Sequence, residues 1–372
     1  MTSTKKIFRK ILIWRYKHIS ERQFVYILSI LVGFLAGLGT VLLKNFTHYI
    51  QLLLSVDFLK ESKSSWYFIF PIIGLLIVAI IKKTWLKKHI GHGISTTLYA
   101  ISKRKGIIPK YNMYASLLTA PITVGFGGSV GLQGPAVSAG TALASYTSQL
   151  FHMNTKTRML LIGCATAGAM SSMFKAPIAG IVFALEVFSL DIAFVSLVPL
   201  LLASVSAIVT SYLFLGSDVL FGFELNDKFE IGEIGFYAIF GIFTGIVSVY
   251  FSLVYFAVRK FFYQFKQRFV RLIIGSIIIG FILYLMPSLY GEGYGLINNL
   301  LKGNHIAAIG NTPFSFDPNN IWIVIILLLL ITFFKAIAMS TTFAAGGVGG
   351  IFIPTLVMGS ALGNAFGKII NN

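Results

Sequence analysis

Long apolar segments separated by short basic stretches dominate the pattern of hydrophobic and polar positions along this chain. Six apolar runs approach or reach the roughly 20 residues that a helix needs to cross a bilayer: residues 24–43, 66–81, 195–215, 234–258, 272–286 and 321–339. Each run predicts a membrane-spanning helix. Composition agrees, because 56% of the 372 residues are hydrophobic and only 11% are charged, whereas soluble domains carry about 25% charged residues. Length alone would permit two soluble domains, but this composition predicts one membrane domain.

The charged residues indicate the topology. The net charge is +18, and basic residues cluster within the first 22 positions and near 82–88, 103–105 and 259–271. Acidic residues gather between two apolar runs, at Asp218, Glu224, Asp227, Glu230 and Glu233. Because short basic loops stay cytoplasmic, we expect a cytoplasmic N-terminus and an external loop at 216–233. Topology explains the basic clusters better than nucleic-acid binding does.

These features predict the domain organisation. Residues 1–22 form a cytoplasmic interfacial helix rather than a signal peptide, because positions 5–16 mix basic and apolar side chains. Residues 23–215 form a first membrane repeat, 216–233 the external loop, and 234–372 a second membrane repeat. Cys164 is the single cysteine, and no Cys/His pattern has metal-ligand spacing, so we expect no disulfide, metal or cofactor.

Two segments, 91–150 and 340–368, are too rich in glycine, small residues and proline to be ordinary spans. Irregular backbone at membrane depth must be covered by protein or line a water-filled cavity, and broken helices mark ion sites in transporters. A shift of 219 positions relates the two segments, because it places Gly127, Gly128, Gly131, Pro135, Gly140, Ala142 and Leu143 on Gly346, Gly347, Gly350, Pro354, Gly359, Ala361 and Leu362. The repeat predicts two related halves. We expect the second half to be incomplete, because only residues 355–372 follow its proline.

Three glycine-bracketed segments carry the candidate chemistry: GHGIS at 91–95, GLQGP at 131–135 and GGIFIP at 349–354. Each precedes a stretch that can be helical. Glycine permits a tight turn and close backbone approach, and proline near a helix start costs no hydrogen bond. The first N–H groups of a helix lack helical partners and lie at the positive end of its dipole, which favours anions. For any one segment, close helix packing through small residues is the alternative.

The three segments resemble the motifs GSGIP, G-[KR]-E-G-P and G-x-F-x-P of the CLC family of voltage-gated chloride channels and chloride–proton antiporters. They occur in the family's order, and residues 174–186 resemble a segment that follows the second motif. The resemblance, from about Phe24 onward, implies an all-α polytopic membrane protein with a CLC-type inverted repeat and re-entrant half-helices. It also implies chloride as the anion and a homodimer. The short length and the lack of the soluble nucleotide-binding tail of some relatives predict a prokaryotic inner-membrane protein.

The same resemblance implies the anion-binding residues, which are His92, Gly93, Ile94, Leu132, Gln133, Gly134, Ile351 and Phe352. His92 stands where the family has a serine. A neutral imidazole still donates one N–H, but this histidine could instead face water at the pore mouth. Ser95 replaces the proline of the first motif. The family's C-terminal tyrosine has no counterpart here.

The proton-handling positions also depart from the family. Gln133 stands where the family has its gating glutamate, which competes with the anion and carries the proton in the antiporters. A glutamine resembles the protonated acid but has no ionisable group. Val187 aligns with the second proton-handling glutamate, and the adjacent Glu186 with a separate family acid. Glu186 could retain a proton role or serve as a structural partner, with Lys175 as one candidate.

The sequence therefore favours passive, channel-like chloride conduction over enzymatic activity, since neither proton-handling position can ionise. Two alternatives stay open: a proton-coupled antiporter that uses His92 or Glu186, and a nonconducting truncated homologue. An intramembrane hydrolase built on Ser129 is disfavoured, because no segment supplies a base within its reach. Fluoride and nitrate are open as substrates, because backbone amides discriminate weakly among small anions.

Overall fold

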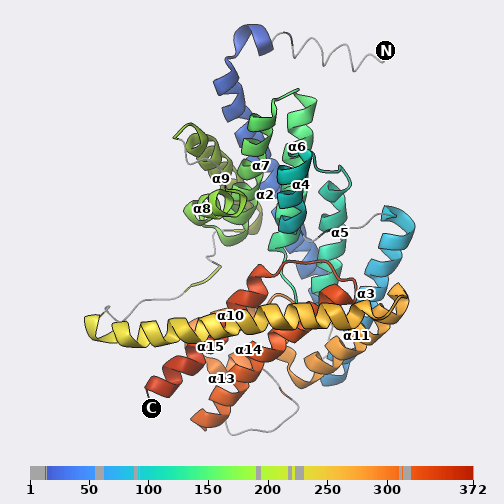
Figure 1. The fold of residues 1–372 in the computed structure, drawn as a ribbon, viewed down its shortest axis with the longest axis vertical. Coiled ribbons are helices and arrows are strands. Elements are labelled where there is room, and N and C mark those ends of the chain that lie inside the picture. Colours follow the sequence, from blue (N-terminus) through green and yellow to red (C-terminus); the bar gives the residue numbers. More distant parts are fainter. Residues whose placement is uncertain are drawn as a thin grey trace. The chain divides into compact units, whose positions relative to one another are not determined.

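The computed structural model describes residues 13, 15–54, 63–87, 91, 93–189, 194–216, 220–222, 230–309, 312 and 320–371, and most of these residues lie in helices joined by short turns and loops (Figure 1). The elements are α2 (Glu21–Leu54), α3 (Lys63–Ile81), η2 (Lys82–Leu86), α4 (Gly93–Arg104), α5 (Asn112–Gly125), α6 (Gln133–Leu150), α7 (Thr155–Phe174), α8 (Pro177–Phe188), α9 (Phe194–Leu215), η3 (Ile231–Glu233), α10 (Ile234–Tyr263), α11 (Arg268–Leu285), η4 (Pro287–Leu289), α12 (Tyr294–Leu301), α13 (His305–Ile309), α14 (Ile321–Ala344) and α15 (Phe352–Ile370). His92 and most of the expected N-terminal helix and external loop lie outside the described residues.

Seven helical segments of the described chain are long and apolar enough to cross a membrane. Six fall on the runs predicted from the sequence, in α2, α3, α9, α10, α11 and α14, and the seventh is α15. Phe262 is the one buried residue of α10, and the other apolar side chains of this helix are exposed or half-buried. Such a helix is stable in a lipid environment, where an apolar surface has no cost. The chain is a multi-pass membrane protein.

α7 is the central helix of the first of two compact units, which comprises the described residues within Met1–Leu43, Ile90–Leu117 and Pro135–Val219. Asn154 caps its first turn, because the side chain accepts a hydrogen bond from the Thr157 N–H at 2.8 Å. Residues 161–173 are all buried, and the helix packs against α8 and α9. Small residues along α7 allow these neighbours to approach closely, as is usual for helices in membranes.

Replacing Gly33 with alanine should lower the stability of this unit. A methyl group at Gly33 would collide with the backbone carbonyl of Ala203, which belongs to α9 and cannot rotate away. Overpacking of this kind costs about 1–3 kcal/mol. We expect a lower midpoint of thermal unfolding in detergent. Gly241→Ala on α10 is the matched control, because a methyl there meets no atom within 4 Å; equal midpoints for the two variants would contradict the packing.

α14 forms the core of the second unit, which comprises the described residues within Lys44–His89, Leu118–Gly134 and Leu220–Asn372. Asn320 caps the helix by accepting a hydrogen bond from the Trp322 N–H at 3.1 Å. α14 packs against α10, α11 and α15, and α11 packs against α3 (Figure 1). The loops that precede α6 and α15 both belong to this unit, so their mutual geometry is defined.

Candidate anion site

The two loops related by the 219-position repeat lie against each other in the second unit. Gly131 and Gly350 form an isolated antiparallel bridge. The Gly131 N–H donates to the Gly350 carbonyl at 2.9 Å, and the Gly350 N–H donates to the Gly131 carbonyl at 2.6 Å. These two glycines are equivalent positions of the repeat, so a local two-fold relation passes between them.

A second pair of hydrogen bonds has the same symmetry. The Val348 N–H donates to Oγ1 of Thr123 at 3.1 Å, and the Ser129 N–H donates to Oγ1 of Thr342 at 3.3 Å. Each threonine hydroxyl in turn donates to the carbonyl four residues earlier in its own helix, at 2.9 Å and 2.7 Å. Thr123 and Thr342 are also 219 positions apart. The threonines therefore connect each half of the repeat to the loop of the other.

The turns that end α5 and α14 are built alike. Gly127 and Gly346 have φ of 95° and 100°, in the left-handed region that favours glycine. The next N–H bonds back to the preceding helix in both turns, from Gly128 to the Thr123 carbonyl at 2.7 Å and from Gly347 to the Thr342 carbonyl at 2.8 Å. The repeat read from the sequence is thus a repeat of backbone conformation and of hydrogen bonding.

Both loops lead directly into a helix N-terminus. α6 begins at Gln133 and α15 at Phe352, and each has proline at its third position, where a missing N–H costs no helical hydrogen bond. A methyl group at Gly350 would lie 2.7 Å from the Gly134 nitrogen, so the two backbones touch. Leu132, Gln133 and Gly134 are buried, whereas Ile351 is exposed and Phe352 half-buried.

The side chain of Gln133 is fixed by a tyrosine. Its Nε2 donates to the hydroxyl of Tyr294, the first residue of α12, at 2.7 Å. Its Oε1 is buried without a hydrogen-bond partner among the described residues. Burial raises the pKa of Tyr294 well above its ordinary value, and the nearby charge of Glu292 raises it further, so this hydroxyl stays neutral.

A carboxylate accepts a hydrogen bond from the loop before α6. The Leu132 N–H donates to Oε1 of Glu292 at 2.9 Å. Glu292 is partly buried in the short turn between η4 and α12, outside the candidate spans. Loss of solvent raises the pKa of this carboxyl to about 7, although the Leu132 bond and the charges of Lys44 and Lys335 oppose the shift. A carboxyl oxygen thus already occupies an amide of the second motif.

The turn that carries Glu292 is held by a completely buried lysine. Nζ of Lys335, in the middle of α14, donates to the carbonyls of Leu289 at 3.3 Å and Gly291 at 3.1 Å. The Tyr290 hydroxyl donates to the Gly125 carbonyl at 2.6 Å. A buried ammonium is tolerated only with such partners or a counter-charge, so Lys335 and Glu292 support each other electrostatically.

The described residues of the first motif belong to the first unit. Gly93 begins α4 with φ of 39°, and its N–H donates to the Gly91 carbonyl at 3.1 Å. Ile94 is half-buried. The Thr97 and Thr141 hydroxyls, 3.0 Å apart, join α4 to α6 within this unit.

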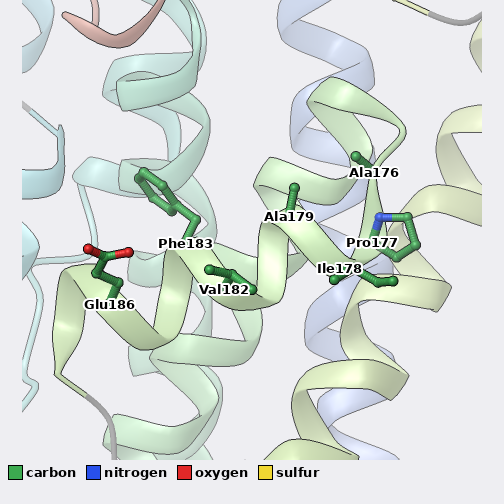
Figure 2. Close-up of a pocket in the computed structure, with 7 residues that line it drawn as sticks. All are labelled: Ala176, Pro177, Ile178, Ala179, Val182, Phe183 and Glu186. Atoms are coloured by element: carbon green, nitrogen blue, oxygen red, sulfur yellow. The ribbon is translucent and has the colours of Figure 1, made fainter. Parts of the chain in front are cut away.

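Glu186 is exposed near the end of α8, also in the first unit. It lines one end of an open, apolar groove of about 690 Å³, with Phe183 beside it, and Ala176 and Pro177 line the other end (Figure 2). Nζ of Lys175, the structural partner suggested by the sequence, donates to the Gly216 carbonyl at 2.7 Å.

The model of the voltage-gated chloride channel family matches residues 73–372. The chain belongs to this family. Among curated relatives, the H(+)/Cl(-) exchange transporter ClcA of Vibrio cholerae is 26% identical over 359 residues, covering 93% of this chain and 73% of the relative. Chloride channel protein CLC-e of Arabidopsis thaliana is 27% identical over 371 residues, covering 91% of this chain and 49% of the relative.

Solved CLC structures share the fold. A CLC-type fluoride/proton antiporter superposes with a TM-score of 0.72 at 22% identity, covering 93% of this chain and 82% of the other. A slow cyanobacterial Cl⁻/H⁺ antiporter superposes with a TM-score of 0.70 at 18% identity, covering 95% and 80%. The expected all-α CLC-type architecture is confirmed. The CLC family is one of transporters and channels. The Ser129 hydroxyl donates to the Leu289 carbonyl at 2.8 Å.

Sequence reasoning overlooked three residues of this candidate site: Glu292, Tyr294 and Lys335. A signal was present for two of them, because Lys335 is the lone charge in the apolar run 321–344 and Glu292 lies between two glycines. Charged residues in such surroundings are functional candidates by default. The contacts of Glu292 with Leu132 and of Tyr294 with Gln133 span 160 and 161 residues of sequence, so no local pattern reveals them.

Proposed function

We propose that this chain transports a small anion, chloride by likeness to its relatives, past the backbone N–H groups at the starts of α6 and α15. The observation that supports this most is the hydrogen bond from the Leu132 N–H to the Glu292 carboxyl, since it shows that this N–H of the second motif is available to an acceptor from outside its own helix. The reciprocal Gly131–Gly350 bridge brings the second and third motifs together. The binding residues are those of the three motifs, with Gln133 at the gate position.

The transport is passive in this proposal. The gate position carries an amide, whose Nε2 is engaged by Tyr294, and Val187 cannot ionise. A coupled exchanger needs a group that gains and loses a proton during each cycle. Glu186 is exposed on the first unit, and it is the acid that the family resemblance alone offers for such a role.

Proton-coupled exchange is the second candidate function. It is favoured by the curated relatives described as H(+)/Cl(-) exchange transporters and by the titratable carboxyl of Glu292 next to the gate position. The further proposals are a homodimer with one pore per subunit, an inner-membrane location and a cytoplasmic N-terminus, which the basic first 22 residues support.

Simultaneous recording of chloride and proton flux from liposomes separates the candidates. Purified protein is reconstituted into chloride-loaded vesicles, and efflux is started with a potassium ionophore. We expect chloride release without stoichiometric proton movement. Proton movement in a fixed ratio to chloride would overturn passive conduction in favour of exchange, and lack of release of any small anion would overturn the transport function itself.

A further inference from the structure

Glu292 is placed where a transported anion would be bound. Its Oε1 lies 2.9 Å from the backbone nitrogen of Leu132. Leu132 belongs to the second motif and is the last residue before α6. A carboxylate oxygen and a halide ion are both negatively charged acceptors, and each can accept a hydrogen bond from a backbone N–H. While the carboxylate accepts this bond, a chloride ion cannot.

Charged and polar groups from four other elements surround this carboxyl. Lys44 of α2 and Lys335 of α14 favour its charged form. Its charge raises the pKa of Tyr294 of α12. The Gln133 amide of α6 also interacts with it. Of these, Gln133 cannot titrate, Tyr294 stays neutral, and Lys44 and Lys335 are bases, so Glu292 carries the one carboxyl among these groups.

We propose that Glu292 is the titratable gate of this protein: its carboxylate competes with the transported anion for the Leu132 N–H, and protonation releases that N–H to the anion. The proposal rests on the anion path proposed above. It assigns the gate to a residue from the turn between η4 and α12, whereas the motif position itself holds the non-ionisable Gln133. The same group gives a passive conductor a dependence on pH.

The sign of the pH dependence follows from the chemistry. Above its pKa of about 7 the carboxyl is charged and holds the Leu132 N–H. Below that value it is neutral, and a neutral carboxyl oxygen is a weaker acceptor. Its protonated fraction rises about tenfold between about pH 8 and about pH 6. Conduction should therefore increase as pH falls, by up to about tenfold over this interval.

The decisive variant is Glu292→Gln, which keeps the size of the side chain and removes the charge. Chloride efflux is measured over the same pH range for wild type, for Glu292→Gln and for Glu233→Gln. The last is a matched control, because Glu233 is exposed at the start of α10 and accepts from the Tyr237 hydroxyl. We expect a steep profile for wild type and Glu233→Gln, and a flat profile at the high level for Glu292→Gln.

The outcomes distinguish the two proposals. Unaltered pH dependence of chloride efflux in Glu292→Gln would overturn the gate and leave anion transport intact, as would a flat wild-type profile. Lack of anion efflux from every variant at every pH would instead overturn the proposed function. A lower unfolding midpoint with an unchanged profile would assign Glu292 a purely structural role.

A measurement on the wild-type protein covers the case in which Glu292→Gln does not fold. Competition makes proton and chloride binding mutually reinforcing, because linkage is reciprocal. Adding chloride to lightly buffered, detergent-solubilised protein near pH 7 should therefore cause proton uptake. Lys44→Gln should move the activation of efflux to higher pH, because loss of this cation favours the neutral carboxyl. No uptake together with an unmoved profile would refute the proposal.

Discussion

Replacing Gly350 with alanine is expected to reduce chloride efflux by about 5- to 100-fold. The added methyl group would lie 2.7 Å from the Gly134 nitrogen and 3.4 Å from the Gly131 carbonyl oxygen. Both are backbone atoms, so the loops before α6 and α15 must separate. A strain of about 1–3 kcal/mol is typical for such overpacking, and each 1.4 kcal/mol in binding is a factor of about ten.

The measurement is chloride efflux from liposomes, with Gly367→Ala as the matched control. Gly367 lies on the same helix, α15, and a methyl there meets no atom within 4 Å. We expect the control to conduct like wild type. If monodisperse Gly350→Ala protein conducts as fast as this control, the close pairing of the two loops is not needed for the anion path.

Replacing Gln133 with glutamate should make conduction strongly dependent on pH. The introduced carboxyl can accept a hydrogen bond from the Tyr294 hydroxyl, which now accepts one from Gln133 at 2.7 Å. It would also lie beside Glu292. Two neighbouring carboxyls cannot both ionise easily, so the pKa of one rises strongly. At high pH we expect at least about a tenfold loss of efflux, since repulsion between like charges excludes the anion; efflux should recover as pH falls.

Efflux as a function of pH tests this, with Gln149→Glu as the control. Gln149 lies near the other end of α6, where its Nε2 donates to the Ser145 carbonyl at 3.1 Å. The control should keep the wild-type profile. If Gln133→Glu keeps it as well, Gln133 does not stand at the gate.

The sequence was most informative for features that depend on neighbouring residues along the chain, namely the membrane-spanning helices and the glycine turns. Apolar runs such as 321–339 predict helices, because a bilayer demands about 20 apolar residues with every backbone group paired. The glycine-rich repeat was readable because a left-handed turn, as at Gly127 and Gly346, restricts residue choice. The repeat even identified the pair, Gly131 and Gly350, that the fold brings into contact.

The cluster of polar residues around Glu292 could not be predicted from local sequence patterns. Nothing local indicates that Glu292 meets Leu132, because the contact depends on how η4, α12 and α14 pack. The burial of Lys335 is explained only by the folded structure, in which its ammonium group donates hydrogen bonds to the carbonyls of Leu289 and Gly291. The roles of His92, Gly93 and Glu186 stay predictions, with His92 outside the described residues.

The most direct test of the account is to locate the anion. Crystals of the reconstitution-competent protein grown with bromide should give an anomalous scattering peak within hydrogen-bonding distance of the Ile351 and Phe352 nitrogens, near Leu132 and Gly134. Bromide peaks found only elsewhere, in protein that transports bromide in liposomes, would contradict an anion path built on the starts of α6 and α15.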